Sequence, residues 1–500
     1  MNFAKSGYEM SHKGLETVME EVRRFSSPKE AVAHIQKIYD ESVTIIREQF
    51  ALFVQGKPVD ERQLKGATYP YLAFSVNKED THDFDTPFSY GVLGEKGLYG
   101  TSLTDPHLFN KYYLEQISAI MENNKLPALV GKSYCPIPFS YVISHVPDGV
   151  EHVCYDEIRK YFTLPDLYYM NDHIANSIQD PRTLVISPLS LFTAERVDYS
   201  LKRLHHYTHT SPHYFQNFVI LTNYQRYMSR FRKLAQNLMD QDKGYYTAFV
   251  ASGDKKYTAK TFPDFAEDHE HLPQMPAYHL LGKDGNGITF INIGIGPSNA
   301  KNITDHLAVL RPHCWLMMGH CAGFRRKQAL GDYVLAQAYV RDDQVLNKDL
   351  PTWVPIPPIA EVQVAMQEAF MEVTGLEGEE MKRHLRTGTV ATTDDRNWEL
   401  RADVLFPQFR QSRAIALDME SATVAANGFR FRVPYGSLLC VSDKPIHGEL
   451  KMKGMAQKFY EKSVQQHLEI GLLTVEILRA RGIEKLHSRK LRGFDEVPFR

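Results

Sequence analysis

The chain has 500 residues, of which 43% are hydrophobic and 24% are charged, and its formal net charge is −2. The length predicts two or three domains with large cores, and the near-neutral charge does not favour nucleic acid or an acidic membrane as a partner. No apolar run approaches the roughly 18 residues of a membrane-spanning helix, and the first residues lack the apolar segment of a signal peptide. We therefore expect a cytoplasmic protein.

The cysteines and histidines form no recognisable metal motif. The five cysteines are Cys135, Cys154, Cys314, Cys321 and Cys440. Because they are odd in number and include no CxxC pair, they predict reduced thiols, and neither a disulfide framework nor a zinc site. The crowded histidines of residues 205–213 have no established metal spacing, so polar contacts are the favoured interpretation and no metal is expected.

Residues 1–190 are predicted to form an α+β domain whose topology the pattern does not assign. A helix is predicted from the start signal Ser27–Pro28 to about Phe53, since apolar residues keep helical spacing over this stretch. The aromatic and β-branched segment Tyr69–Val76 is typical of a strand. Asp105–Pro106 indicates the start of another helix.

Residues 191–500 alternate between strand and helix patterns, which predicts an α/β domain with a parallel or mixed sheet. The predicted strands are 218–221, 246–251, 278–281, 288–295, 314–318, 334–336 and 387–392. The predicted helices include 193–206, 227–238 and 455–480. The glycine-rich turn at 283–287 predicts that the two strands around it form a hairpin.

Residues 414–449 carry the densest set of candidate functional groups. The apolar runs Ala414–Leu417 and Ser437–Val441 are predicted strands, and the carboxylates of Glu420 and Asp443 follow them. Ligands of open parallel sheets bind outside the carboxyl ends of the strands. We therefore expect Glu420 and Asp443 to face one cleft from neighbouring strands.

Each carboxylate has a purely structural interpretation as well. Asp443 is either a cap for backbone N–H groups or a general acid, because a carboxyl group in a dry cleft can hold a proton for a leaving group. Glu420 is either a surface residue or an acceptor of two hydrogen bonds from vicinal hydroxyls.

Three further features suit a ligand site. Gly294 and Gly296 lie in a strand-to-helix turn, which predicts either free N–H groups for an anion or sugar, or a tight structural turn. Arg226 stands in the first turn of a predicted helix, where it suits either a phosphate or solvent. Trp398 suits either stacking on a base or packing in a core.

Five motifs follow one another along the chain: NIGIGPSNAK, MMGHCAGF followed by GDYVLAQAYVRDD, TGTVATTDDRNWE, ALDMESATVAA and LLCVSDKPIHGE. Together they resemble the nucleoside phosphorylase family of purine and uridine enzymes and, within it, closely, the bacterial AMP nucleosidases. The resemblance to this subfamily extends upstream through SPLSLFTAERVDYSLKRLHHYTH and LTNYQRY. It covers nearly the whole chain, including an N-terminal domain that the simple phosphorylases lack.

The resemblance implies a three-layer αβα sandwich of the phosphorylase type in the C-terminal domain. Asp443 matches the acid that protonates purine N7, and Glu420 matches the glutamate that binds the ribose 2′ and 3′ hydroxyls. The substrate-binding residues expected from the resemblance and the patterns together are Met419, Arg226, Trp398, Gly294, Gly296, His320 and Ser442.

Two positions depart from the simple phosphorylases. Met317 and His320 stand where those enzymes place an arginine and a serine or threonine. The loss of this phosphate clamp favours water as the nucleophile and leaves Arg226 for a phosphate already on the substrate. His320 is a candidate for positioning the water.

The expected reaction is AMP + H2O → adenine + ribose 5-phosphate, a step of purine salvage. The resemblance also implies a homo-hexamer, activation by MgATP, inhibition by phosphate, a regulatory N-terminal domain and chemistry that requires no cofactor. Two alternatives stay open: a purine nucleoside phosphorylase, and a catalytically silent adenine-nucleotide sensor.

Overall fold

The computed structural model describes residues 14–77, 90–143, 155–178, 183–241, 244–262, 272–449, 455–486, 489–493 and 496–500. The chain forms two compact units. One unit comprises Met1–Lys202 with Gly493–Arg500, and the other comprises Arg203–Arg492. The predicted boundary after residue 190 lies 12 residues before this division, which follows Lys202 inside helix α7 (Ala194–Thr208).

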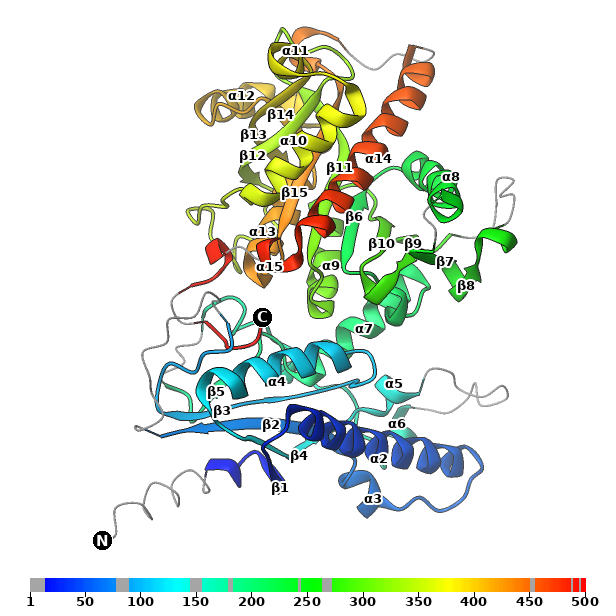
Figure 1. Cartoon of the computed structure of the whole chain (residues 1–500), viewed down its shortest axis with the longest axis vertical. Helices are drawn as coiled ribbons and strands as arrows, with labels where there is room; N and C mark the ends of the chain where they lie inside the picture. Colours follow the sequence, from blue (N-terminus) through cyan, green and yellow to red (C-terminus); the bar gives the residue numbers. More distant parts are fainter. Residues whose placement is uncertain are drawn as a thin grey trace. The chain divides into compact units, whose positions relative to one another are not determined.

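The first unit is built on a five-stranded sheet in the order β1-β4-β2-β3-β5 (Figure 1). Its strands are β1 (Met19–Phe25), β2 (Thr68–Val76), β3 (Gly97–Ser102), β4 (Ala128–Pro136) and β5 (Ile186–Pro188). Its helices are α2 (Pro28–Val54), α3 (Glu61–Lys65), α4 (Asn110–Asn124), α5 (Phe139–Val142) and α6 (Tyr155–Ile158). All strand pairs are antiparallel except β3 with β5.

One of the two predicted helix starts in this unit is correct and the other is not. Helix α2 begins at Pro28, as predicted, and buries an apolar stripe that includes Ile35, Ile46 and Phe50. Helix α4 begins at Asn110, so the prediction of a start at Asp105–Pro106 was wrong. Asp105 has a positive φ of 34° and its carboxylate accepts a hydrogen bond from the backbone N–H of Leu108, which makes a turn before the helix.

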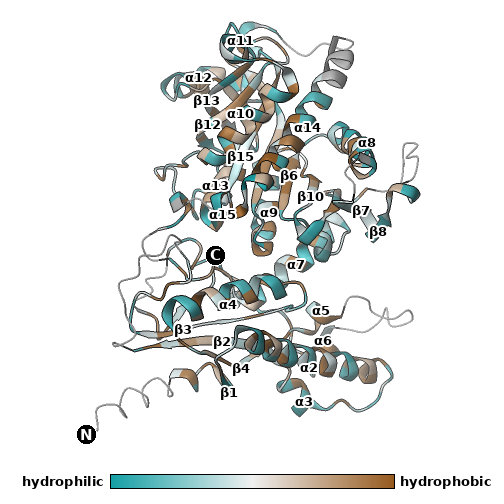
Figure 2. Cartoon of the chain, viewed as in Figure 1, coloured by the Kyte–Doolittle hydropathy of each residue, from teal (hydrophilic) through white to brown (hydrophobic). Residues whose placement is uncertain are grey.

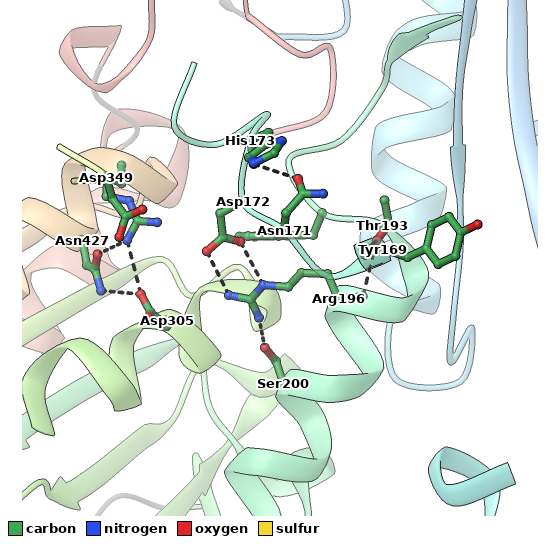
Figure 3. A network of polar contacts seen from close by, with 12 residues as sticks. Tyr169, Asn171, Asp172, His173, Thr193, Arg196, Ser200, Asp305, Asp349 and Asn427 are labelled. Atoms are coloured by element: carbon green, nitrogen blue, oxygen red, sulfur yellow. Dashed lines mark hydrogen bonds and ion pairs between the residues drawn. The ribbon is translucent and has the colours of Figure 1, made fainter. Parts of the chain in front are cut away.

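Helix α7 brings buried polar side chains into the first unit. Asp198 accepts hydrogen bonds from the Tyr69 hydroxyl at 2.6 Å and the Thr104 hydroxyl at 2.7 Å, and burial raises the pKa of Asp198 to about 7. Two residues earlier on α7, the Arg196 guanidinium contacts the carboxylate of Asp172, with an N–O distance of 2.9 Å, and also donates to the Ser200 hydroxyl (Figure 3). These contacts bind α7 to the first unit.

The last residues of the chain complete the core of the first unit. Phe499 is 2% exposed, and its backbone N–H donates to the carbonyl of Leu189 at 2.9 Å. The Tyr112 hydroxyl donates to the carbonyl of Arg500 at 2.9 Å. The ring of Phe499 meets the ring of Tyr112 edge to face, with 6.0 Å between centroids. The C-terminal segment is therefore a structural part of the first unit.

Replacing Phe499 with alanine is expected to lower the free energy of unfolding of the first unit by about 3–5 kcal/mol, because it leaves a cavity at a fully packed site. Denaturant unfolding followed by circular dichroism measures this change. The matched control is Tyr168→Ala, since Tyr168 is 89% exposed in the same unit and should cost less than about 0.5 kcal/mol. Equal stability of the two variants would contradict the packing role of the C-terminal segment.

The second unit contains a ten-stranded mixed sheet in the order β14-β13-β12-β15-β11-β6-β10-β9-β7-β8 (Figure 1). The strands are β6 (Phe218–Thr222), β7 (Tyr246–Ala251), β8 (Lys255–Tyr257), β9 (Ala277–Gly282), β10 (Ile288–Asn292), β11 (Cys314–Gly323), β12 (Tyr333–Asp342), β13 (Leu385–Thr393), β14 (Ala416–Asp418) and β15 (Tyr435–Asp443). Strand β14 also pairs with β11, which closes β11, β15, β12, β13 and β14 into a ring.

The helices of the second unit cover this sheet. They are α8 (Gln225–Gln241), α9 (Pro297–Leu307), α10 (Ala360–Thr374), α11 (Gly378–His384), α12 (Ala402–Gln411), α13 (Ser421–Phe431), α14 (Met455–Arg481) and α15 (Ile483–Leu486). Helices α8 and α10 both pack on α14, and α9 packs on α13. The strands between them are strongly hydrophobic (Figure 2), and β6 and β11 are buried over their full lengths.

The predicted α/β class is confirmed, and so is the predicted hairpin. Strands β9 and β10 pair antiparallel around the turn at residues 283–287. The cysteines in the described part of the chain, Cys135, Cys314, Cys321 and Cys440, are free thiols, and Cys154 lies outside the described residues. Among the described helices, none is both long and apolar enough to cross a membrane.

Candidate active site

The site forms where β6 and β10 end and where β14 leads into α13. Strands β6 and β10 are parallel and in register, with Thr222 opposite Asn292. The residues that follow these strands therefore start at the same level of the sheet. Asn223 comes directly after β6, and the turn with Gly294 and Gly296 follows β10.

Glu420 lies between these two turns and is 1% exposed. One carboxylate oxygen accepts a hydrogen bond from the backbone N–H of Gly296 at 2.7 Å. The other accepts from the side-chain amide of Asn223 at 2.9 Å. The turn after β10 and the turn after β6 therefore both donate a hydrogen bond to the carboxylate of Glu420.

The glycine turn needs its glycines for conformational reasons. Gly294 has φ 71° and Gly296 has φ 113°, values that side chains with a Cβ rarely adopt. Gly296 is the N-cap of α9, so Glu420 also lies at the partially positive end of a helix. The turn therefore positions Glu420, because the N–H of Gly296 donates to this carboxylate. The same N–H is not available to an anion of a ligand.

Burial raises the pKa of Glu420 to about 8, and the neighbouring Asp418 adds to the rise. The hydrogen bonds from Gly296 and Asn223 act in the opposite direction, because they favour the charged form. Burial also raises the pKa of Asp418, which accepts hydrogen bonds from the Thr392 hydroxyl at 2.5 Å and the backbone N–H of Ser421 at 2.9 Å. A negative charge on Asp418 therefore disfavours the charged form of Glu420.

The two helices that start at the site are linked to each other. The side-chain amide of Asn427, on α13, donates to two residues of α9. It donates to the Thr304 hydroxyl at 2.8 Å and to the Asp305 carboxylate at 2.9 Å (Figure 3). The glycine turn precedes α9, and Glu420 precedes α13. This link therefore fixes the position of Glu420 relative to its N–H donor.

Asp443 ends β15, and its relation to Glu420 differs from the prediction. The prediction of neighbouring strands was wrong, because β14 and β15 both pair with β11 and not with each other. Ala322 on β11 lies opposite Asp443 on one side and opposite Leu417 on the other. Strand β14 is also antiparallel to β11, so the two carboxylates follow strands that run in opposite directions.

Asp443 itself is half-buried, and its carboxylate accepts a hydrogen bond from the Ser442 hydroxyl at 2.6 Å. The loop after it is closed by the buried Lys444, whose ammonium lies 2.7 Å from the carboxylate of Glu449. Asp443 and Ser442 are thus held at the end of β15 by a short, bridged loop.

Strand β11 supplies Met317 and His320, the two positions that differ from simple phosphorylases. Both side chains are buried. The His320 ring meets the Tyr224 ring edge to face, with 4.8 Å between centroids. Between these positions, a Cβ on Gly319 would approach the side-chain oxygen of Asn223 at 3.2 Å, so β11 lies directly behind the residue that holds Glu420.

Tyr224 is a site residue that the sequence did not reveal. Burial is the main cause, and the negative charges of Glu420 and Asp443 the next, of the rise of its pKa to about 12. Tyr224 is therefore close to both predicted catalytic carboxylates and to His320. Its position two residues after β6 was the available signal, but the sequence favoured Arg226, two residues later, as the polar group of this turn.

The remaining predicted residues lie around this centre or in the nearby core. Arg226 is exposed in the first turn of α8, and the adjacent Gln225 accepts a hydrogen bond from Asn292 at 3.2 Å, so this turn adjoins the glycine turn. Met419 is half-buried next to Glu420. Trp398 is 5% exposed and packs with aromatic side chains and Leu417 in a hydrophobic cluster. Its contact with a base stays a prediction.

The polar groups of the site can hold a ligand with hydroxyls and a basic heterocycle. No group of three or more His, Cys, Asp or Glu side chains within the described ranges is arranged to hold a metal ion. A buried glutamate near a half-buried aspartate is the arrangement that hydrolysis of a glycosidic bond requires, since one group supports the cationic sugar and the other can protonate the leaving group.

Comparisons with known proteins give matches for both units. The family described as "Bacterial AMP nucleoside phosphorylase N-terminus" matches residues 30–184, and the family described as "Phosphorylase superfamily" matches residues 249–476. The AMP nucleosidase of Escherichia coli strain K12 is 45% identical over 481 residues, covering 95% of this chain and 98% of that protein. A guanosine phosphorylase of Halorubrum lacusprofundi is 22% identical, covering 43% of this chain and 87% of that protein.

Among solved structures, the AMP nucleosidase of Bacteroides thetaiotaomicron is similar with a TM-score of 0.42 and 28% identity. The match covers 57% of this chain and 99% of that one.

Proposed function

Because the chain belongs to the AMP nucleosidase family, we propose that it hydrolyses the N-glycosidic bond of AMP to adenine and ribose 5-phosphate. The observation that carries this proposal is the 45% identity to an AMP nucleosidase over nearly the full length of both chains. The buried Glu420 and the half-buried Asp443, each with fixed hydrogen-bond donors, support it, because they suit the chemistry of this bond.

The first step in the proposed mechanism is departure of adenine. Asp443 gives a proton to N7 while the electrons of the C1′–N9 bond move onto the base, so adenine leaves as a neutral molecule. The sugar becomes an oxocarbenium ion. Glu420 binds the ribose 2′ and 3′ hydroxyls, and its negative charge stabilises the cation.

Water then completes the reaction. Its oxygen forms a bond to C1′ and its proton passes to the solvent, which gives ribose 5-phosphate, and Asp443 regains a proton from the solvent. We propose that His320 helps to position this water, and Tyr224 adjoins the same histidine ring. Met317 and His320 replace the phosphate clamp of the simple phosphorylases, which favours water over phosphate as the nucleophile.

Arg226 is proposed to bind the 5′-phosphate of AMP, because a guanidinium in the first turn of a helix suits a phosphate group. Replacing Arg226 with alanine is expected to reduce kcat/KM for AMP by roughly tenfold to a hundredfold relative to adenosine, since a charge-assisted contact is lost only with the phosphorylated substrate. Steady-state kinetics with both substrates measure this ratio.

The matched control for Arg226 is Lys233→Ala, which removes an exposed cation from the same helix. The preference of this control for AMP over adenosine should equal that of the wild type. If Arg226→Ala keeps the same preference as well, the 5′-phosphate contact is assigned to the wrong residue.

Further properties are proposed on the basis of the family resemblance. They are a cytoplasmic homo-hexamer, an N-terminal unit that regulates the reaction, activation by MgATP, inhibition by phosphate and no cofactor in the chemistry. Analytical ultracentrifugation tests the assembly: a species of six chains supports it, and a monomer or dimer at assay concentration contradicts it.

The products distinguish the proposed hydrolysis from phosphorolysis. With AMP and inorganic phosphate both present, hydrolysis gives ribose 5-phosphate, which has one phosphorus signal in a 31P NMR spectrum. Phosphorolysis would give ribose 1,5-bisphosphate, which has two. Accumulation of the bisphosphate would replace the proposed function with that of a phosphorylase.

A further inference from the structure

A cavity in the second unit is lined mainly by cationic side chains. Its volume is about 610 Å3, and its lining includes five cations and no acidic residue. The five cations are Arg325, Arg326, Lys327, Lys382 and Arg386. They come from the segment that follows β11, from α11 and from the start of β13. None of the residues that line the cavity is among those assigned to the candidate active site around Glu420 and Asp443.

The charges of this cavity are not neutralised by neighbouring acids. Within the part of the chain that the structure describes, none of the five cations forms an ion pair with an acidic side chain. Two acids that lie close to the lining residues in the fold have other partners: Glu380 pairs with Arg383 at 3.2 Å, and Asp332 pairs with His384 at 2.9 Å. Arg383 and Lys382 are adjacent in sequence, yet only Arg383 has an acidic partner.

Two of the arginines are held in place by backbone carbonyls. Arg386 donates to the carbonyl of Lys327 at 3.0 Å, and Arg325 donates to the carbonyl of Arg413 at 3.3 Å. The Nε–H of Arg386 is buried and lacks an acceptor among the described residues. These contacts keep the guanidinium groups near one another, although like charges repel. An anion in the cavity would offset that repulsion.

The cavity also has an apolar part. Leu385 is 4% exposed and Ile415 is half-buried, and both contribute to its lining. A volume of this size lies within the range of pockets that bind small molecules, about 300–1,000 Å3, and exceeds what a single phosphate ion fills. Several clustered cations match a ligand with several negative charges, and arginine suits phosphate oxygens in particular.

We propose that this cavity binds a compact anion with two or more phosphate groups. The binding site is separate from the proposed site of AMP hydrolysis, and the proposal does not depend on that reaction. A solvated cationic surface would instead bind all anions weakly and in proportion to their charge, with the same response to salt.

Isothermal titration calorimetry with inorganic tripolyphosphate tests the proposal on the full-length protein. We expect saturable binding to the wild type and at least about a tenfold loss of affinity in the double variant Arg326→Ala/Lys382→Ala, because two charge-assisted contacts are removed. Orthophosphate should bind more weakly than tripolyphosphate. The control Arg383→Ala should leave the affinity for tripolyphosphate unchanged, since its guanidinium is paired with Glu380.

Both substituted side chains are exposed, so the double variant should fold, and unchanged AMP hydrolysis by that variant checks this. The single variant Lys382→Glu gives a second test by reversing one charge, and it should weaken binding further than Lys382→Ala. Equal binding of tripolyphosphate by the wild type and the double variant would overturn the proposal. So would equal losses in the double variant and in Arg383→Ala, which would indicate a general charge effect.

Discussion

Replacing Asp443 with asparagine is expected to reduce kcat for release of adenine from AMP by about 10²–10⁴-fold, the usual contribution of a general acid. The variant keeps the size of the side chain and can still accept the hydrogen bond from Ser442, but it has no proton to give to N7. Steady-state assays of adenine release measure the change. Turnover close to that of the wild type would remove Asp443 from the role of acid.

A second substrate separates acid catalysis from loss of structure. A p-nitrophenyl riboside 5-phosphate releases p-nitrophenolate, which leaves without protonation, so Asp443→Asn should lose much less activity with it than with AMP. The matched control is Asp284→Asn, because Asp284 lies in the exposed β9–β10 turn with φ 57°, a conformation that asparagine tolerates. Equal losses with both substrates would indicate that Asp443 has a structural role.

Above about pH 8, where Glu420 is charged, replacing it with glutamine is expected to reduce kcat/KM for AMP by about 10²–10³-fold, because the negative charge beside the cationic sugar is lost. Gly296 N–H and the Asn223 amide, which now donate to Glu420, would face a neutral side chain. The control Glu399→Gln changes an exposed glutamate of the same unit and should have no effect. A small effect of Glu420→Gln would show that its charge does not support the reaction.

The raised pKa of Glu420 also predicts the direction of the pH dependence. Glu420 is protonated below about pH 8 and charged above it, and the charged form is the one that stabilises the oxocarbenium ion. We therefore expect kcat/KM to rise with pH through about 8 in the wild type and to lack this rise in Glu420→Gln. Kinetics from about pH 6 to about pH 9 measure both profiles. A falling profile in the wild type would contradict the role of the charged form.

The raised pKa of Glu420 also makes the stability of the folded protein depend on pH. The pKa of Glu420 is raised in the folded state from an ordinary value of 4.5, so the folded protein binds more protons than the unfolded one between these values. Stability should therefore fall as the pH rises from about 4.5 to about 8. Asp418 is shifted in the same direction by burial and adds to this trend.

Local patterns predicted the individual elements well. Helix α2 and the β9–β10 hairpin followed from apolar spacing and turn residues, which depend only on nearby sequence. The predicted site residues Glu420 and Gly296 are likewise brought together. Their direct hydrogen bond joins positions more than a hundred residues apart, and no local pattern carries that information.

Most of the features that were missed depend on distant pairing, whereas the wrong start of α4 was a local turn at Asp105. Strand β11 lies between β14 and β15, which run in opposite directions, and the apolar runs of these two strands look the same in either direction. Tyr224 lies near both carboxylates because the ends of β6, β14 and β15 come together in the fold. Phe499 is buried in the first unit although it follows the whole of the second, which sequence spacing does not indicate.

Whether water cleaves the glycosidic bond of AMP is decided by measuring adenine release from AMP with and without inorganic phosphate. We expect sustained release in buffer free of phosphate, at a rate that added phosphate does not increase. Release that requires phosphate would identify a phosphorylase, and binding of AMP without any release would identify a sensor; either result would rule out the proposed hydrolysis.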